Sequence, residues 1–531
     1  MKSAILLLTG LFFLLQLNQP PLNQALSEED PKADTTDITA WLQQQYPKLP
    51  APKKEFRSGH ISMRKIVDMS LDRVDGFALQ LPHQGMTPSP TIYNDLLLVS
   101  GGFGSKEYYA FDAKTGQMKW GMDLDDDGPT SAAVVDDIAV FNTESCTIFA
   151  VQASSGKLLW SYWLGDPLMS TPAIGNGLVY TAYPAHGIAS GGGYSPNASP
   201  NHYNQLPIQQ NQISQPEQTV SENLPSLAAG HKWRPTHVLI AMDLYSGEIK
   251  WQRWLDGDIL SAPVVEGTEL HLSSFSGTIY QFDAISGALK SAQMSQATSA
   301  PSIVGKNVFV SRRADKGDNI GESISMLDRG SGEIQMDQYE KAAPYLDQQV
   351  QTRSALKKEA MDYDAGNGFG AGAPANSGWQ SAAYNIGQSN VSSLQAFTGS
   401  RVLHYDDRNY SLMGDELICT NPKNGKINWQ MDIDGDLQQS GGFLATAPIR
   451  AGKHIIIATL KGEVIVMDAQ KGKETMRFSL GEPIRYAPVV DNGRIYVSSM
   501  RGKIYCLETD DPSISGWPTL SANAARTNRI Q

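Results

Sequence analysis

The chain has 531 residues, of which 41% are hydrophobic and 18% are charged, and its formal net charge is −12. This composition allows a packed core and excludes wholesale disorder. The acidic balance argues against a nucleic-acid binder, which needs a basic face to neutralise phosphates.

The N-terminal residues are typical of a secretory signal peptide. Lys2 gives a positive start, an apolar run covers residues 4–17, and Asn23-Gln24-Ala25 is an imperfect cleavage site. The run is too short for a comfortable membrane span. We expect residues 1–25 to be removed, leaving a mature chain without a transmembrane domain. An uncleaved N-terminal anchor is the alternative. No Cys follows the apolar run, which excludes a bacterial lipoprotein anchor by residue type.

Residues 26–56 are acidic and contain Pro, so we expect a flexible N-terminal segment before the folded domain. The chain has three cysteines, Cys146, Cys419 and Cys506, at spacings that fit no zinc or haem motif. One pair of them is able to form a disulfide, and the sequence leaves this pairing open.

From residue 57 onward a repeated pattern dominates the sequence. The phrase from Asp112 to Trp120 returns from Gln152 to Trp160 and from Asp243 to Trp251. Weaker copies begin at Asp283, Asp328, Asn421 and Asp468, and a degenerate eighth copy begins at Glu508. A fixed period of about 40 residues indicates a propeller or a solenoid.

Each repeat unit contains four short β-rich runs separated by Gly, Asn or Asp turns, which are hairpin signals. Four runs per unit match one four-stranded propeller blade. We therefore predict an all-β, eight-bladed propeller over residues 57–510. The last unit lacks an outer strand, so we predict that residues near 75–81 supply it and close the ring, which removes open sheet edges. Residues 511–531 form a C-terminal extension that we expect outside the ring.

Two long insertions interrupt the ring pattern. Residues 185–235 are rich in Gly, Ser, Asn, Gln and Pro, which is a loop composition. Residues 337–400 begin with a weakly helical pattern and continue into a Gly-rich loop with several aromatic residues. Long loops on a rigid scaffold often carry function, so we expect protein partners to bind there. The alternative is that the aromatic residues pack the second loop onto the ring.

The repeated phrase has a structural explanation. Its Asp caps a tight turn, its Gly supplies a positive φ, and its Trp lies between neighbouring blades. The residues that we expect to dock blades on one another are Asp112, Gly116, Trp120, Gly156, Trp160, Asp243, Gly247, Trp251, Asp283, Gly287, Asp328, Gly332, Gly425, Trp429, Asp468 and Gly472.

This phrase resembles the Ala-x-Asp-x-x-Thr-Gly-x-x-x-Trp motif of the pyrroloquinoline-quinone (PQQ) repeat family, over roughly residues 75–508. The resemblance implies an eight-bladed propeller and two possible kinds of function. The family contains dehydrogenases that bind PQQ and Ca²⁺ and use an Asp base near the ring axis. It also contains non-enzymatic members similar to BamB, a subunit of the machinery that assembles outer-membrane β-barrels.

The sequence lacks several features of the family's enzymes. No two cysteines are adjacent, although the alcohol dehydrogenases carry an adjacent pair over the quinone, and no Cys-x-x-Cys-His motif occurs. The nine histidines form no metal-hydrolase motif. We therefore nominate no catalytic residue.

Two acidic stretches are candidates for a Ca²⁺ site, because oxygen-rich loops suit this ion. The first contains Asp123, Asp125 and Asp127, and the second contains Asp432, Asp434 and Asp436. Both follow a predicted outer strand, so a recurring turn between blades explains them equally well.

The sequence thus predicts an exported, PQQ-like propeller that serves as a binding or scaffold protein in the periplasm or outer envelope of a bacterium. The alternatives are a PQQ- and Ca²⁺-dependent dehydrogenase and a BamB-like assembly subunit.

Overall fold

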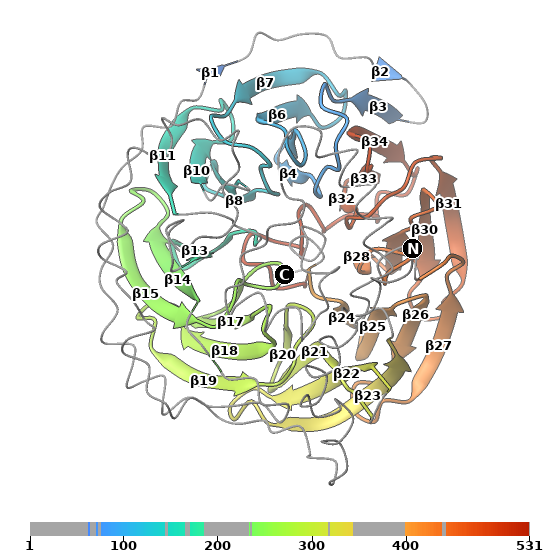
Figure 1. The fold of residues 1–531 in the computed structure, drawn as a ribbon. Helices are drawn as coiled ribbons and strands as arrows, with labels where there is room; N and C mark the ends of the chain where they lie inside the picture. The colour runs from blue at the N-terminus through green and yellow to red at the C-terminus, as the bar shows by residue number, and fades with distance from the viewer. Residues whose placement is uncertain are drawn as a thin grey trace, which may run out of the picture.

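The fold is known from a computed structural model, which describes residues 62–63, 71–72, 76–143, 147–164, 170–184, 233, 236–316, 319–343, 399–437 and 442–529. Every regular element in these ranges is a β-strand, and the strands form eight antiparallel sheets around one axis (Figure 1). The predicted all-β, eight-bladed propeller is confirmed. The predicted signal peptide, the flexible segment, Cys146 and most of both insertions lie outside the described residues.

The first four blades follow one another in chain order, each from its inner to its outer strand. Blade 1 contains β4 (Thr91–Tyr93), β5 (Leu96–Ser100), β6 (Glu107–Asp112) and β7 (Met118–Asp123). Blade 2 contains β8 (Ala133–Val135), β9 (Ile138–Asn142), β10 (Thr147–Gln152) and β11 (Leu158–Trp163). Blade 3 contains β12 (Ala173–Gly175), β13 (Leu178–Pro184), β14 (His237–Asp243) and β15 (Ile249–Leu255). Blade 4 contains β16 (Val264–Glu266), β17 (Glu269–Ser273), β18 (Thr278–Asp283) and β19 (Leu289–Met294).

The other four blades complete the circle in the same order. Blade 5 contains β20 (Ser302–Val304), β21 (Asn307–Arg313), β22 (Gly321–Asp328) and β23 (Ile334–Ala342). Blade 6 contains β24 (Val402–Tyr405), β25 (Arg408–Met413), β26 (Glu416–Thr420) and β27 (Ile427–Asp432). Blade 7 contains β28 (Ile449–Ala451), β29 (His454–Ala458), β30 (Glu463–Asp468) and β31 (Glu474–Ser479). Blade 8 contains β32 (Val489–Asp491), β33 (Arg494–Ser498) and β34 (Lys503–Glu508).

The ring is closed by an N-terminal strand, as predicted. β3 (Gly76–Gln80) pairs antiparallel with β34 and becomes the outer strand of blade 8. Gly76 has a φ of +114°, and a Cβ atom there would lie 1.9 Å from the carbonyl oxygen of Cys506. The start of this strand therefore requires glycine.

Two short strands extend outer edges further. β1 (Ser62–Met63) pairs antiparallel with β7, and β2 (Leu71–Asp72) pairs antiparallel with β3. Blades 1 and 8 are therefore five-stranded at the rim, whereas the other six sheets have four strands within the described residues.

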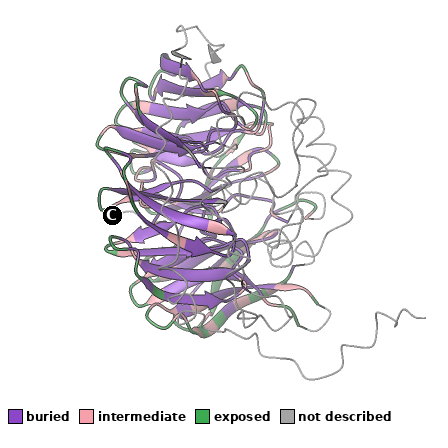
Figure 2. Cartoon of the chain, turned by 60° about the vertical axis from the view of Figure 1, so that its left-hand side comes forward, coloured by how far each residue is buried: buried purple, intermediate pink, exposed green. Residues whose placement is uncertain are grey.

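The core lies between the blades, where buried apolar side chains of neighbouring sheets pack together. Figure 2 shows that most of the strands are buried. Tyr108 of blade 1 and Phe141 of blade 2 are both buried and stack with ring centroids 4.2 Å apart. Because successive residues of a strand point to opposite faces, each middle strand buries apolar residues on both sides. This explains why these strands are nearly continuous apolar runs.

One element differs from its predicted structure. Residues 337–342 were expected to begin a weakly helical insertion, but they are the second half of strand β23, and Ala342 pairs with Gly321. The segment is rich in Gln, Asp, Glu and Lys, and several of these residues favour helices locally. Pairing along β22 overrides this preference.

The C-terminal extension is also not where it was expected. Residues 511–529, called the axial segment below, run inside the ring, with the C-terminal end near its centre (Figure 1). The expected position outside the ring was wrong. The sequence shows no strand pattern in this segment, and its hydrogen-bond partners come together only when the ring has closed.

Candidate functional site

Both insertions leave the ring on the same face. Pro184, at the end of β13, lies opposite His237, at the start of β14. Ala342, at the end of β23, lies opposite Gly321, at the start of β22. In every blade, the connection between the second and third strands and the connection to the next blade emerge at this end. We call it the insertion face, and the opposite side, which carries the repeated phrase, the turn face.

On the turn face, the Asp of the repeated phrase organises the turn between the third and fourth strands. The Oδ1 atom of Asp243 accepts backbone N–H bonds from Tyr245 at 3.1 Å and Ser246 at 2.8 Å. These bonds, with Ser246 first, hold the pKa of Asp243 below its ordinary value. Gly247 follows with a φ of +66°. The equivalent carboxylates that accept two such backbone bonds are Asp112, Asp328 and Asp468, and Asp283 accepts one from Ser286.

The Trp of the phrase contacts the next blade. The indole N–H of Trp160 donates to the carbonyl of Leu244 at 2.9 Å, and a Cβ atom on Gly247 would lie 2.9 Å from its ring. The same pair of contacts joins Trp120 to Ala153 and Gly156, Trp251 to Ala284 and Gly287, and Trp429 to Ala469 and Gly472. These Trp side chains are thus engaged in contacts between blades.

Blades 4 and 5 lack this Trp, and in each a Gln of the outer strand contacts the Gly of the next blade. Gly332 lies against the side chain of Gln293, and Gly425 lies against the backbone of Gln338. The Gln338 amide also donates to the carbonyl of Pro422. Gly116 keeps the positive φ of the other turns, at +72°. The Gly with a positive φ therefore recurs in the turns of blades 1 to 7, while the side chain that contacts it varies.

On the insertion face, buried aspartates hold the next blade. Asp126 accepts hydrogen bonds from the hydroxyls of Thr143 at 2.7 Å and Thr147 at 2.5 Å. Asp256 accepts from Tyr280 at 2.9 Å and from Thr278. Burial raises the pKa of Asp256, against the effect of these hydrogen bonds. Each carboxylate thus fastens the turn between the second and third strands of the blade that follows it.

The Ca²⁺ candidates lie at the ends of outer strands and in the turns that follow them. Asp123 ends β7 and Asp432 ends β27, while Asp125 and Asp127 flank the buried Asp126. Asp434 and Asp436 are exposed, and Asp434 lies 3.5 Å from the Lys461 ammonium. Among the residues that the structure describes, no group of three or more His, Cys, Asp or Glu side chains is arranged to hold a metal ion. The Ca²⁺ assignment stays a prediction.

The axial segment bonds the inner strands of several blades. Backbone N–H groups of Val490, Ile174 and Val265 donate to the carbonyls of Trp517 (2.8 Å), Ala524 (2.8 Å) and Ala525 (2.9 Å). Further contacts reach blade 1 through Ile92 and blade 6 through Asn528, which donates to the carbonyl of Val402. The segment therefore ties together blades on all sides of the axis.

Arg526 makes several of the hydrogen bonds that hold the axial segment in place. Its guanidinium is fully buried and donates to the carbonyls of Pro172 at 3.1 Å and Leu520 at 2.8 Å, and to the hydroxyl of Thr519 at 3.1 Å. Burial lowers the pKa of Arg526 to about 9, which still leaves the group charged near neutral pH. The axial segment thus holds a buried charge at the centre of the ring, bonded to the inner end of blade 3 through Pro172.

A buried ion pair joins blades 5 and 6 near the axis. The guanidinium of Arg401 contacts Glu322, which is fully buried, and donates to the carbonyl of Thr298 at 3.0 Å. The Thr298 hydroxyl donates to Glu322 at 2.5 Å, and the ring of Phe443 lies 4.0 Å from the Arg401 guanidinium carbon. Every strong polar group of this cluster is therefore paired.

Sequence reasoning missed these buried polar groups to different degrees. Asp126 and Asp256 lie in acidic turns that recur after an outer strand, so the repeat contained a signal for their common role. Glu322, Arg401 and Arg526 carry no local signal, because their partners come from distant parts of the chain.

Fold and contacts define the class of the protein: an eight-bladed β-propeller whose blades dock through a repeated Asp-Gly-Trp turn. The family described as outer membrane protein assembly factor BamB matches residues 86–193, 372–473 and 413–515. The chain belongs to this PQQ-repeat, BamB-like family of propellers.

Individual relatives are distant. BamB from Burkholderia pseudomallei (strain K96243) is 26% identical over 210 residues, which are 38% of this chain and 53% of that protein. The chain thus spans about half the length of this curated relative. The crystal structure of BamB from Moraxella catarrhalis is 13% identical, covers 82% of this chain and 99% of its own, and has a TM-score of 0.47. The structure of the quinohemoprotein alcohol dehydrogenase ADHIIG from Pseudomonas putida HK5 is 12% identical and has a TM-score of 0.44. The match covers 79% of this chain and 70% of that one.

Proposed function

We propose that this protein is an exported, non-enzymatic scaffold of the bacterial cell envelope that binds other proteins, in the manner of a BamB-like subunit of outer-membrane protein assembly. The observation that carries the proposal is the axial segment, which bonds the inner strands of blades 1, 3, 4 and 8 at the centre of the ring. Because these inner strands are held by the chain's own backbone, we place partner binding on the two faces and the rim. Family membership supports the envelope as the compartment.

The insertion face is the surface that we propose for the main partner. Residues 185–235 and the segment that follows Ala342 both connect to the ring at this end, and Trp233 lies at the end of the first insertion. Its indole N–H donates to the Tyr280 hydroxyl at 2.7 Å, and this hydroxyl in turn bonds Asp256. A rigid ring with long connections on one face suits the recognition of a protein partner.

The test is affinity purification of the tagged full chain from bacterial envelopes after crosslinking, with identification of the recovered proteins. We expect a β-barrel assembly protein with the wild-type chain. A matched variant in which a short Gly-Ser linker joins Pro184 to Trp233 keeps the buried Trp233 and the β13–β14 strands and should recover much less of it. Equal recovery with this variant contradicts the role of the first insertion, and no recovery with either chain contradicts the BamB-like function.

The dehydrogenase alternative has its own test. A titration with PQQ and Ca²⁺, followed by absorbance and melting temperature together, should leave both unchanged if the protein is the scaffold that we propose. A ligand that binds the folded state must raise the melting temperature. A saturable, Ca²⁺-dependent rise would therefore replace the scaffold proposal by the quinoprotein alternative.

A further inference from the structure

The outer rim of the ring differs between blades that carry the same motif. Trp120, Trp160 and Trp251 are 5%, 1% and 8% exposed. Trp429 makes the same contacts with the next blade but is only half-buried, as is Met431 in the same strand. In β31, Met476 and Phe478 occupy the corresponding positions and are also half-buried. The rim of blades 6 and 7 therefore presents apolar groups that are buried in other blades.

The chain itself shows one way to cover such a rim. In blade 1, where Trp120 and Met122 are buried, β1 adds a fifth strand to β7, with Ser62 opposite Asp123 and Met63 opposite Met122. In blade 8, β2 extends β3 in the same antiparallel manner. Blades 6 and 7 are four-stranded in the described part of the chain, and β27 and β31 lie at the perimeter (Figure 1).

The hydrogen-bonding direction of these two outer strands follows from contacts at their ends. The N–H of Ile433 donates inward to Asp415 at 2.7 Å, and that of Leu480 donates inward to Gly462 at 2.7 Å. Because inward and outward residues alternate in an antiparallel pair, the backbone groups of Gln430 and Arg477 point away from the ring. Both residues are exposed. Each strand thus offers outward donors and acceptors on its open edge.

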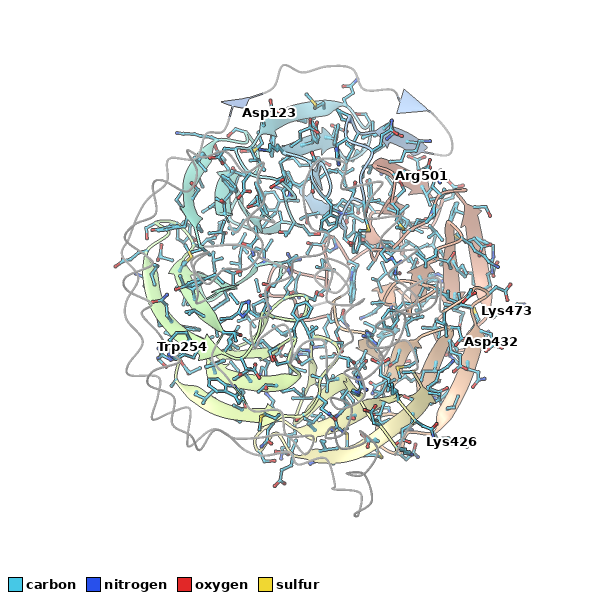
Figure 3. The ribbon with its side chains drawn as sticks, in the orientation of Figure 1. Asp123, Trp254, Lys426, Asp432, Lys473 and Arg501 are labelled. Atoms are coloured by element: carbon cyan, nitrogen blue, oxygen red, sulfur yellow. The ribbon has the colours of Figure 1, made fainter. Side chains whose placement is uncertain are left out.

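The side chains beside these edges alternate in character. On β27, Trp429 and Met431 lie on one face, and Gln430 and Asp432 lie on the other. On β31, Met476 and Phe478 alternate with Thr475, Arg477 and Ser479. Figure 3 shows Lys426, Asp432 and Lys473 at the ends of these strands on the outer rim. A strand added here would meet apolar groups with every second side chain and polar groups with the others.

We propose that the open edges of β27 and β31 form a docking site for an extended polypeptide segment in which apolar and polar residues alternate, held by strand addition. Such alternation is the pattern of strands that form membrane β-barrels. The proposal rests on the proposed scaffold function for the identity of its natural client. Its experiment is independent of that function, because it measures peptide binding directly.

The experiment uses the full mature chain and a fluorescent peptide of about ten residues, the length of a barrel strand, with strictly alternating apolar and polar residues. A peptide of the same composition without alternation is the control. The test variant Gln430→Pro/Arg477→Pro removes outward donors but leaves inward pairing, since Pro is tolerated at edges. The matched variant Gln430→Ala/Arg477→Ala loses the same side chains but keeps the N–H groups.

We expect saturable binding of the alternating peptide by fluorescence anisotropy, with slower amide exchange in β27 and β31. The proline variant should bind about tenfold more weakly or not at all, while the alanine variant binds like wild type and both melt cooperatively. Absent binding, equal binding of the two peptides, or equal binding by the proline variant overturns the proposal. The proposal is also overturned if the wild-type chain self-associates and the proline variant does not. In that case a second copy of the chain, and not a peptide, occupies the strand edges. Loss of peptide binding with continued recovery of an assembly protein would leave the proposed function intact.

Discussion

At the scale of the residue, the same Trp of the repeated phrase lies in two different environments. Trp160 is 1% exposed and Trp429 is half-buried, although each donates its indole N–H to a carbonyl of the next blade, at 2.9 and 3.0 Å. The contribution of a large side chain to stability grows with the apolar area that it removes from water. Equal positions in the repeat therefore need not contribute equally.

We expect Trp160→Ala to lower the free energy of unfolding by about 3–5 kcal/mol, the usual range for a large buried aromatic. Trp429→Ala should cost less, because Trp429 is only half-buried and its removal takes less apolar area out of the core. Urea denaturation followed by circular dichroism measures both. A larger loss for Trp429 than for Trp160 would contradict this assignment of burial.

The buried ion pair of Glu322 and Arg401 allows a second comparison at this scale. Glu322→Gln keeps the shape but leaves the buried guanidinium without a counter-charge, and we expect a loss of about 3–5 kcal/mol. The matched change Glu474→Gln removes an exposed pair with Arg477 and should cost under about 1 kcal/mol. The same denaturation experiment distinguishes the two, and similar small losses would show that solvent reaches Glu322.

At the scale of the element, strand β17 carries a buried His beside a carboxylate. Burial lowers the pKa of His271 below its ordinary value, more than the neighbouring Glu269 raises it. The neutral ring donates from Nε2 to Glu269 at 3.0 Å, and Arg329 of blade 5 donates to the same carboxylate at 2.6 Å. Hydrogen bonds from His271 and Arg329 hold the pKa of Glu269 well below its usual range.

These shifts predict the effect of pH on the junction of blades 4 and 5. His271 binds a proton more readily in the unfolded chain than in the folded one. Its contribution to the free energy of unfolding is therefore present above about pH 6.5 and is lost as the pH falls below this value. Glu269 adds stability that is present above about pH 4.3 and is lost at lower pH. His271→Gln keeps a donor to Glu269 but cannot be protonated.

The melting temperature of the wild type should therefore fall more between pH 7 and 5 than that of His271→Gln, while both fall below about pH 4.3. Scanning calorimetry across this range measures the difference. Parallel curves for the two proteins would mean that His271 is not kept neutral by burial.

Two strands show what the sequence was able to predict. β3 was predicted because the last repeat lacks a fourth strand and because the segment near Phe77 precedes Pro90 by the spacing found in other repeats. The second half of β23 was missed, since its residue types favour helices and only pairing with β22 decides its structure. Local preference thus failed where pairing with a neighbouring strand decided the structure.

At the scale of the whole molecule, the axial segment acts as a brace across the ring. It buries Trp517 and Leu520, and it receives backbone bonds from inner strands of blades 1, 3, 4 and 8. Several of its residues hold a left-handed backbone, among them Ala522 at +76° and Arg526 at +58°. Such conformations persist only where surrounding contacts fix them.

A chain that stops after Asp510 should lose stability on the order of 5 kcal/mol or more, from lost apolar burial and about 1 kcal/mol per hydrogen bond. A synthetic peptide of residues 511–531 added in trans should restore part of the melting temperature. The control Arg529→Ala, which removes a half-buried pair with Glu266, should change it little. An unchanged melting temperature after truncation would contradict the bracing role.

The sequence by itself determined the repeat, the number of blades, the closure by an N-terminal strand and the turn that docks one blade on the next. These features are local or periodic, so residue types at fixed spacing specify them. Only the tertiary structure decided that the C-terminal segment bonds the inner strands, that Arg526 and Glu322 are buried, and that blades 6 and 7 have four strands in the described part of the chain. Each of these depends on partners distant in the chain, which come together only when the ring closes.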